Sequence, residues 1–588
     1  MKRCPECRRN YTDETLNFCL DDGAALLDGP ASESSKAGLG SGAEYLSADH
    51  ESETAIFHST DAPGEEKTAP QIHTTQRTEI LPGARESKIE GAKRLVRAWI
   101  FISILLAAGI GGYFGYQYLS SKTKPIASIA VMPFVNASGN ADLEYLSDGI
   151  TETLINSLTQ LPSMSVKARS AVFRYKGKDL DPAQIATELN AEAVLNGRVM
   201  QRGDTITLSL DLVDGATGNQ IWGEQYNRNV SDLVLLQKEI ARDVSNKLST
   251  KLSRTDEKKL ASSSTVDPEA YQLYLQGRYQ WNKRTAEGVT KAKEYFQKAI
   301  EKDPGYALAY AGLADSYIVV ANLLPFEAKP EAKVAGLKAL ELDPSLGEAH
   351  AVLGNVAFYY EWDWPTAERE YKRAIELNPN YATAHHWYGE SLAALGKFDE
   401  SFAEFKRAAE LDPVSPAISS DLGWAYFNAR QFDRAEAHLK KLIELDPSFI
   451  RTYFYLAAVY EELGRFPESI EMRRTGLLKQ ERDAGKVEAA IARLKSGLAD
   501  SGEAGYWKAA TDLTVEGAKR AGEPPNPVDM ATLHAHLNDR SKAFEWLEKA
   551  YRDRWSGLAF LNTDPAWDNL RDDPRFGELL QRVGLPRG

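Results

Sequence analysis

The hydrophobic pattern of residues 267–483 repeats at a nearly constant interval. Asp-Pro or Asn-Pro pairs mark the period, and their prolines lie 40, 35, 34 and 34 positions apart. Between them, apolar residues recur at the spacing of a helix, which predicts two amphipathic helices for each unit. A period near 34 is typical of stacked helical hairpins that are each too small to bury their own apolar face. The prolines are Pro304, Pro344, Pro379, Pro413 and Pro447.

Small and large residues alternate within these units as closely packed helices require. Gly389 and Gly423 stand where two helices must approach, and Phe405 and Leu439 follow at the positions that fill the gap. This pattern resembles the tetratricopeptide repeat over about residues 267–483, with a weaker copy near 526–552 inside a C-terminal helical cap at 484–588. The resemblance implies a superhelix of hairpins whose hollow side binds another polypeptide.

Residues 125–262 show a different pattern, that of a compact α/β domain. Short apolar runs alternate with helical segments, and residues 204–214 alternate strictly between apolar and polar side chains, which predicts a strand with one buried face. The predicted order is βαβαββα. The phrases Ile129-Ala130-Val131-Met132-Pro133-Phe134 and Leu146-Ser147-Asp148-Gly149-Ile150 resemble the N-terminal domain of TolB-like proteins. Bacterial proteins that join such a domain to tetratricopeptide repeats carry them behind a variable sensor or effector segment.

An apolar segment precedes the α/β domain. Residues 98–119 contain no charge and would span roughly 33 Å as a helix, which predicts a transmembrane helix at 95–119. The excess of Lys and Arg before the segment places the N-terminus in the cytoplasm and the later domains outside a bacterial inner membrane. Ala107, Gly111 and Gly115 form a stripe of small residues, which predicts pairing of two such helices in a homodimer.

The three cysteines all lie in the first 19 residues. Cys4 and Cys7 form a Cys-x-x-Cys knuckle, Cys19 follows, and Asp22 stands where a second knuckle would place its last ligand. The segment resembles a short zinc ribbon over residues 1–28, which implies structural zinc held by Cys4, Cys7, Cys19 and Asp22. Water or Asp21 could replace Asp22, and a disulfide with one free thiol is the alternative to zinc.

Composition adds two expectations. Residues 29–92 are rich in Ser, Gly, Glu and Thr without apolar periodicity, which predicts a disordered linker. The formal charge of −14 and the absence of a basic patch in the first 28 residues argue against nucleic-acid binding.

The repeats also offer candidate contacts for a partner. If the helices are phased as the repeat implies, the first helix of each hairpin turns an aromatic, weakly acidic stripe toward the hollow side. An apolar or basic peptide segment would fit such a stripe, because aromatic anchors dominate peptide interfaces. The alternative is that these side chains pack against neighbouring repeats. The stripe comprises Asn355, Phe358, Tyr359, His386, Glu390, Trp424, Phe427 and Phe454.

No sequence motif of a catalytic site is present. We find no phosphate-binding loop, no kinase loop, no His-Glu-x-x-His pair and no Gly-x-Ser-x-Gly turn, so we expect no enzymatic activity. The adjacent histidines His385 and His386 point to different sides of a helix and suit packing better than catalysis. The sequence predicts a membrane-anchored scaffold that recruits a partner protein. The alternative is a signalling subunit that binds a small ligand in the α/β domain and signals across the membrane.

Overall fold

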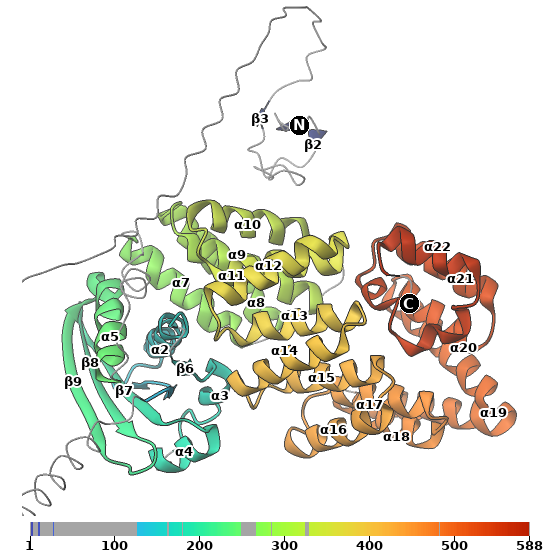
Figure 1. Ribbon diagram of the computed structural model, residues 1–588, viewed down its shortest axis with the longest axis horizontal. Helices are drawn as coiled ribbons and strands as arrows, with labels where there is room; N and C mark the ends of the chain where they lie inside the picture. The colour runs from blue at the N-terminus through green and yellow to red at the C-terminus, as the bar shows by residue number, and fades with distance from the viewer. Residues whose placement is uncertain are drawn as a thin grey trace, which may run out of the picture. The chain divides into compact units, whose positions relative to one another are not determined.

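The structure is a computed structural model that describes residues 126–161, 164–178, 180–248, 266–283, 285–323, 329–480 and 483–586, and three short strands near the N-terminus. An α/β domain is followed by a long helical region (Figure 1), so the predicted fold class is confirmed at this level. The N-terminal strands pair antiparallel in the order β2-β1-β3. They are β1 (Lys2–Arg3), β2 (Asn10–Tyr11) and β3 (Leu27–Asp28).

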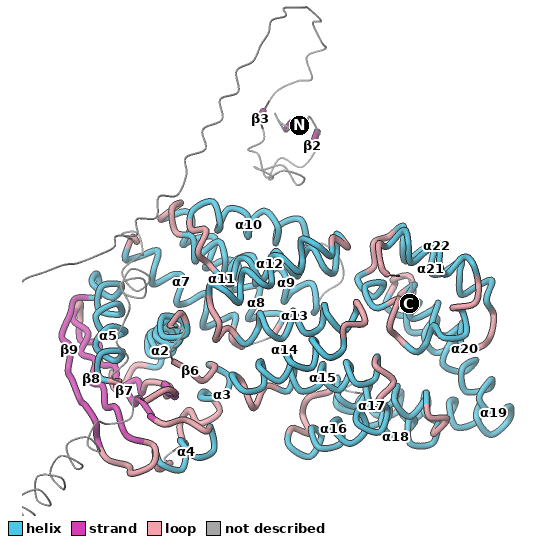
Figure 2. The backbone as a smooth tube through the Cα atoms, in the orientation of Figure 1, coloured by secondary structure: helices cyan, strands magenta, loops and turns pink. Residues whose placement is uncertain are grey.

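The α/β domain is built on a mixed sheet in the order β6-β4-β7-β8-β9, with β5 paired to β7. Strands β4, β6 and β7 run parallel, whereas β7, β8 and β9 run antiparallel. Helices α2 and α5 pack against each other and against the sheet (Figure 2). The strands are β4 (Ser128–Val131), β5 (Val135–Asn136), β6 (Ser165–Val166), β7 (Ala193–Arg202), β8 (Thr205–Asp214) and β9 (Gln220–Asn229). The helices are α2 (Glu144–Thr159), α3 (Arg169–Phe173), α4 (Pro182–Leu189) and α5 (Leu233–Lys247).

The strand pattern is confirmed in β8 and corrected in β7. In β8, Ile206, Leu208 and Leu210 are buried while the residues between them are more exposed, as strict alternation predicts. The predicted order βαβαββα omits β7 as a strand of its own, although β7 is ten residues long and lies inside the sheet. Only its first residues are an apolar run, and Gly197 in its middle lacks a side chain because the ring of Phe134 occupies that space.

The helical region consists of antiparallel hairpins. In the part that the structure describes, twelve helices between α7 and α18 pair as six consecutive hairpins, each first helix packing on the next helix along the chain. Helix α11 continues into a short π-helix, η3 (Ala357–Glu361). The helices are α7 (Pro268–Trp281), α8 (Ala286–Lys302), α9 (Ala307–Leu323), α10 (Lys329–Leu342), α11 (Gly347–Val356), α12 (Trp364–Leu377), α13 (Ala382–Ala394), α14 (Phe398–Leu411), α15 (Pro416–Asn428), α16 (Phe432–Leu445), α17 (Arg451–Glu462) and α18 (Phe466–Gln480).

The recurring Asp-Pro and Asn-Pro pairs end the second helix of the hairpins, as predicted. Helices α8, α12, α14 and α16 each stop at the residue before the Asp or Asn, whose backbone is extended with φ between −131° and −137°. The proline ring clashes with a helical conformation of the residue before it, so the helix cannot continue. The period of the sequence is therefore the period of the hairpins.

The predicted close approach of glycine and large side chains is also confirmed. A Cβ atom added to Gly389 would lie 3.0 Å from the ring of Phe405, and one added to Gly423 would lie 2.5 Å from the Leu439 side chain. In protein structures a Cβ atom almost never lies as close as 2.5 Å to another side chain, so there is no room for one at Gly423. The two helices of these two hairpins can pack this closely only because one of them carries glycine.

The α/β domain shares its core with the first repeats. Buried side chains of the sheet, of α2 and of α7 to α11 belong to one hydrophobic cluster. Glu152 of α2, 3% exposed, accepts hydrogen bonds from Arg278 (2.7 Å) and Asn282 (2.6 Å) in and after α7. Farther along, the backbone N–H of Ala168 donates to the carbonyl oxygen of Leu411 at 3.0 Å. The α/β domain is therefore joined to the repeats by buried apolar and charged contacts.

The C-terminal residues fold back onto the middle repeats. The long helix α19 is kinked at Ser501 and Gly502, and a further hairpin and short helices follow it. Trp567, Leu570 and Phe576 form one core with Phe358 and Trp364 of the repeats. The elements are α19 (Ala484–Ala521), α20 (Pro527–His536), α21 (Arg540–Arg552), η4 (Ser556–Phe560), η5 (Pro565–Leu570) and α22 (Pro574–Val583).

The predicted localisation in an inner membrane is corrected by the structure. Among the described residues, no helix combines the length and the apolar character needed to cross a bilayer. The longest one, α19, carries Lys486, Arg493 and Lys495 within its first turns and is kinked, so it does not suit a hydrocarbon core. The predicted span at 95–119, with its stripe of Ala107, Gly111 and Gly115, lies outside the described residues.

Candidate binding site on the first helices of the repeats

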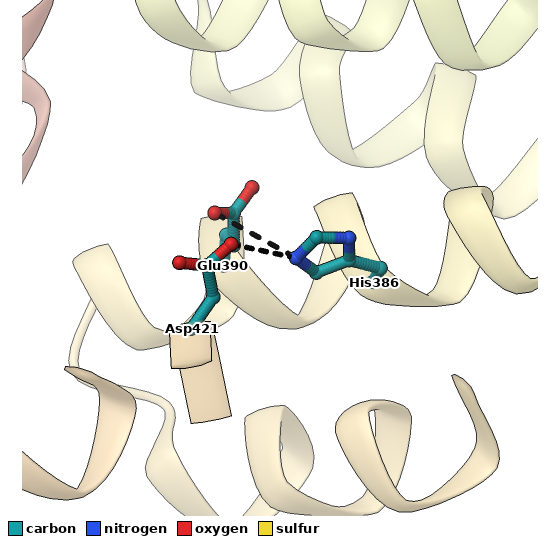
Figure 3. A group of neighbouring side chains, drawn as sticks. All are labelled: His386, Glu390 and Asp421. Atoms are coloured by element: carbon teal, nitrogen blue, oxygen red, sulfur yellow. Dashed lines mark hydrogen bonds and ion pairs between the residues drawn. The ribbon is translucent and has the colours of Figure 1, made fainter. Parts of the chain in front are cut away.

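The first helices of four successive hairpins, α11, α13, α15 and α17, contact one another in turn. Their side chains therefore form one surface drawn from several repeats, the arrangement by which such arrays present a binding face. Figure 3 shows three polar side chains at its centre, His386 and Glu390 from α13 and Asp421 from α15, which point toward one another. These residues are the centre of the candidate site.

His386 links the two carboxyl groups. His386 and Glu390 lie four residues apart on α13 and so project from the same face, one turn apart. Nε2 of His386 is 3.0 Å from Oδ2 of Asp421 and 3.9 Å from Oε1 of Glu390. One ligand atom from each of the three residues lies within 4.8 Å of the other two. Imidazole nitrogen and carboxylate oxygen are the donor types of protein zinc sites, so these residues could hold a metal ion.

Helix α17 supplies the remaining partners of Asp421. Nη1 of Arg451 donates to both carboxylate oxygens of Asp421 at 3.2 and 3.3 Å, and the hydroxyl group of Tyr455 donates to Oδ1 at 3.3 Å. The Asp421 side chain is 5% exposed, whereas that of Arg451 is 46% exposed. The buried carboxylate is thus held by groups from two helices, and the guanidinium group reaches it from the solvent side.

The pKa values of the two carboxyl groups are shifted in opposite directions. Burial raises the pKa of Glu390 to about 8, and the negative charge of Asp421 acts in the same direction. Burial would also raise the pKa of Asp421, but the hydrogen bond from His386 and the charge of Arg451 outweigh burial and lower it. The pKa of His386 is raised, because attraction to Glu390 and Asp421 exceeds the opposing effect of burial. Near neutral pH the site therefore holds one protonated and one ionised carboxyl group.

Aromatic rings border this charged centre. The Trp424 ring stacks on Tyr455 with centroids 4.5 Å apart and on Phe427 at 4.4 Å. Trp424 and Tyr455 are partly exposed, while Phe427 is 2% exposed. Burial raises the pKa of Tyr359, and the charges of Glu390 and Asp421 act in the same direction.

The stripe predicted from the sequence divides into two groups in the structure. His386, Glu390 and Trp424 lie at the site, with Tyr359 at its edge. The other predicted positions are buried or turned elsewhere: Asn355 is 4% exposed, Phe358 packs against Phe560 of the C-terminal region, Phe427 lies in a hydrophobic cluster, and Phe454 contacts Gly476 of α18. A partner-binding role for the first group remains a prediction.

Three residues of the site were missed from the sequence, namely Asp421, Arg451 and Tyr455. A signal for two of them existed, because Asp421 and Tyr455 are 34 residues apart and so occupy equivalent positions in adjacent repeats. Asp421 is the charged residue of helix α15, whose other side chains are uncharged, and this was a second signal. The predicted zinc ligands Cys4, Cys7, Cys19 and Asp22 lie outside the described residues, so the zinc ribbon remains a prediction.

Comparison with protein families supports the division into two regions. Residues 125–268 match the family described as the second domain of HilA/YgeH-like transcriptional regulators. The expected likeness to TolB remains a prediction. Residues 356–416 and 392–448 match two models of the tetratricopeptide repeat.

Relatives of known name match only part of the chain. The chain is 37% identical over 187 residues to a putative adenylate cyclase 3 of Rhizobium meliloti, covering 32% of each protein. It is 20% identical over 284 residues to the transcriptional regulator HilA of Salmonella typhimurium, covering 47% of this chain and 49% of that protein. The chain thus spans about a third to a half of the length of these relatives.

Solved structures with similarity to the chain include several proteins with helical repeats. The Pseudomonas aeruginosa pilF structure is 19% identical, covers 42% of this chain and 92% of its own, and has a TM-score of 0.27. YrrB, described as a tetratricopeptide-repeat protein with an unusual peptide-binding site, is 22% identical over 34% of this chain and 97% of its own, with a TM-score of 0.24. Together with the hairpins described above, the family models identify the C-terminal region of this chain as tetratricopeptide repeats.

Proposed function

We propose that this protein is a scaffold without catalytic activity that binds a partner polypeptide on the surface formed by α13, α15 and α17. The observation that carries the proposal is the group of partly exposed aromatic rings, Trp424 and Tyr455, beside a charged centre on the first helices of tetratricopeptide repeats. Aromatic side chains bury a large area at low entropic cost and are the commonest anchors of peptide interfaces.

The rest of the repeat array supports this choice of surface. The α/β domain contacts the first repeats and, just before α3, the end of α14, and the C-terminal region contacts Phe358 and the turn at Arg430. At the proposed surface, by contrast, Arg451 keeps a half-exposed side chain. An apolar peptide with basic residues fits the surface, because the whole chain carries a formal charge of −14.

The named relatives are consistent with a module that serves different proteins. One is named a transcriptional regulator and the other a putative adenylate cyclase, and each shares only part of its length with this chain. We propose that the shared part binds other polypeptides in each case, while the unshared parts differ in activity.

The test is peptide binding by the full-length protein. Peptides selected from a random library against the wild-type chain should bind Trp424→Ala at least tenfold more weakly, the loss of about 1.4 kcal/mol or more that an anchor residue gives. Leu445→Ala is the matched control, since Leu445 is a 74% exposed apolar residue on the second helix α16 and should leave affinity unchanged. Near-ultraviolet circular dichroism checks that both variants are folded. Equal affinity of the two variants for every selected peptide would disprove the proposal.

A further inference from the structure

We propose that His386, Glu390 and Asp421 bind a divalent transition-metal ion, with zinc as the best match to their chemistry. The site goes beyond the proposed peptide binding and does not depend on it. It is formed by two helices of adjacent repeats, α13 and α15, which are held together by the packing of the array.

The distances between the donor atoms are close to those of a metal site. A tetrahedral zinc ion with bonds of about 2.0–2.2 Å to nitrogen and oxygen separates its ligand atoms by about 3.3 Å. The His386–Asp421 and His386–Glu390 separations of 3.0 and 3.9 Å lie on either side of that value. Small rotations of these side chains would bring the three donor atoms into a zinc coordination shell, leaving a fourth position for water or a partner's side chain.

The site already binds a positive charge. The guanidinium group of Arg451 donates to both oxygens of Asp421 and so occupies a position that suits a cation. Because the Arg451 side chain is 46% exposed, it can move into solvent when a metal ion takes its place at Asp421. A doubly charged ion bonded directly to both carboxylates would neutralise their negative charge better than the guanidinium group, which contacts Asp421 alone.

Metal binding must release a proton from Glu390. Burial and the charge of Asp421 raise the Glu390 pKa to about 8, so at pH 7.5 the group is largely protonated without metal. His386 must be neutral to bind the ion, and its pKa is also raised. Arg451, Tyr455, Tyr359 and Tyr371 also interact with the site and keep their protons in this range, since burial and neighbouring carboxylates raise the pKa of the three tyrosines. Asp412, whose pKa is raised by burial, interacts with His386 as well. Because metal ligands must be deprotonated, zinc affinity should fall as the pH is lowered.

The experiment counts zinc ions on the full-length protein. After treatment with a chelator, the wild-type chain is equilibrated with zinc by dialysis, and bound metal is measured. Glu390→Gln is the best variant, because glutamine resembles the protonated acid and preserves the metal-free site while it removes one anionic ligand. We expect Glu390→Gln and His386→Ala each to lose one zinc ion per chain. Zinc held by Cys4, Cys7 and Cys19 is common to all variants and cancels in this difference.

Two further variants separate metal binding from a purely structural role. His385→Ala is the matched control, because His385 lies next to His386 but pairs with Glu404 at 2.6 Å, and it should bind zinc like the wild type. Arg451→Gln removes the competing cation and should bind zinc about fivefold more tightly. An equal zinc count in the wild type and Glu390→Gln, or weaker binding by Arg451→Gln, would overturn the proposal.

Discussion

The side-chain amide of Asn380 donates a hydrogen bond of 2.8 Å to the carbonyl oxygen of Met164, a residue 216 positions earlier in the chain. The same Nδ2 atom lies within hydrogen-bonding distance of the carbonyl oxygens of Thr159 and Leu161, and Arg407 donates to Oδ1 of Asn380. Asn380 is 5% exposed. One amide group therefore satisfies the backbone after helix α2 and fixes the α/β domain to the turn between α12 and α13.

Replacing Asn380 by alanine should destabilise the protein by about 1–3 kcal/mol, because several buried carbonyl oxygens would lose their donor. Urea unfolding measures the change. Ser345→Ala is the matched control, since Ser345 occupies the equivalent position one repeat earlier and is exposed, hydrogen-bonding only its neighbour Asp343. We expect the control to change stability by less than about 0.5 kcal/mol. A similar loss in both variants would show that Asn380 is not the link.

The charged contact between α2 and α7 should be more sensitive. Arg278→Met leaves the buried carboxylate of Glu152 with Arg169 and Asn282 alone, and loss of one partner of a buried pair costs about 3–5 kcal/mol. Adding Glu152→Gln to this variant should recover little of the loss, since the largely buried Arg169 would then lose its carboxylate partner. Burial acts to raise the pKa of Glu152, but Arg278 and Arg169 more than offset it and lower the pKa. The stabilisation is thus present above about pH 4.5 and lost as pH falls through the lowered value.

The sequence predicted those features whose cause is local. The residue before a proline cannot remain helical, so the hairpin boundaries at Asp412-Pro413 and Asp446-Pro447 follow from two residues each. The pairing of Gly423 with Leu439 likewise follows from the fixed geometry of one hairpin. These interactions span fewer than 20 residues, and their pattern recurs in several repeats.

Features that depend on distant segments could not be predicted in the same way. Strand β7 has few apolar residues after Leu195, and it is a strand because β4, β5 and β8 pair with it. The docking of the C-terminal region on Phe358 depends on Phe560, about 200 residues away. At the candidate site, Tyr455 contacts Asp421 whereas the predicted Phe454 lies against Gly476, because neighbouring residues of a helix point about 100° apart. The asparagines of Asn378-Pro379-Asn380, where other repeats have aspartate and then glycine, serine or valine, were a visible sign of a special turn.

The stability of the metal-free protein should fall as pH rises from 5.5 to 8.5. The unfolded chain releases the Glu390 proton near pH 4.5, whereas burial holds it in the folded chain to about pH 8, so unfolding releases a proton throughout this range. The raised pKa of His386 acts in the same direction, since its contribution is complete below about pH 6.5 and lost above its folded value. Glu390→Gln should reduce this slope, leaving the part due to Glu462, Asp564 and His386, and be more stable than the wild type at pH 8.5. Urea unfolding in the presence of EDTA measures both, and equal slopes would contradict the assignment.

The packing of the hairpins can be tested at Gly423. Alanine favours a helix over glycine by about 1 kcal/mol, so Gly423→Ala would stabilise the protein if space were available. The added Cβ would lie 2.5 Å from Leu439, however, and overpacking of this kind costs about 1–3 kcal/mol, so we expect a net loss of stability. Gly517→Ala in α19 is the control, because nothing lies within 4 Å of its added Cβ and the helix propensity should raise stability. Combining Gly423→Ala with Leu439→Val, which shortens the opposing side chain, should restore part of the loss in thermal unfolding. If Gly423→Ala is as stable as Gly517→Ala, the helices of this hairpin are farther apart than the structure places them.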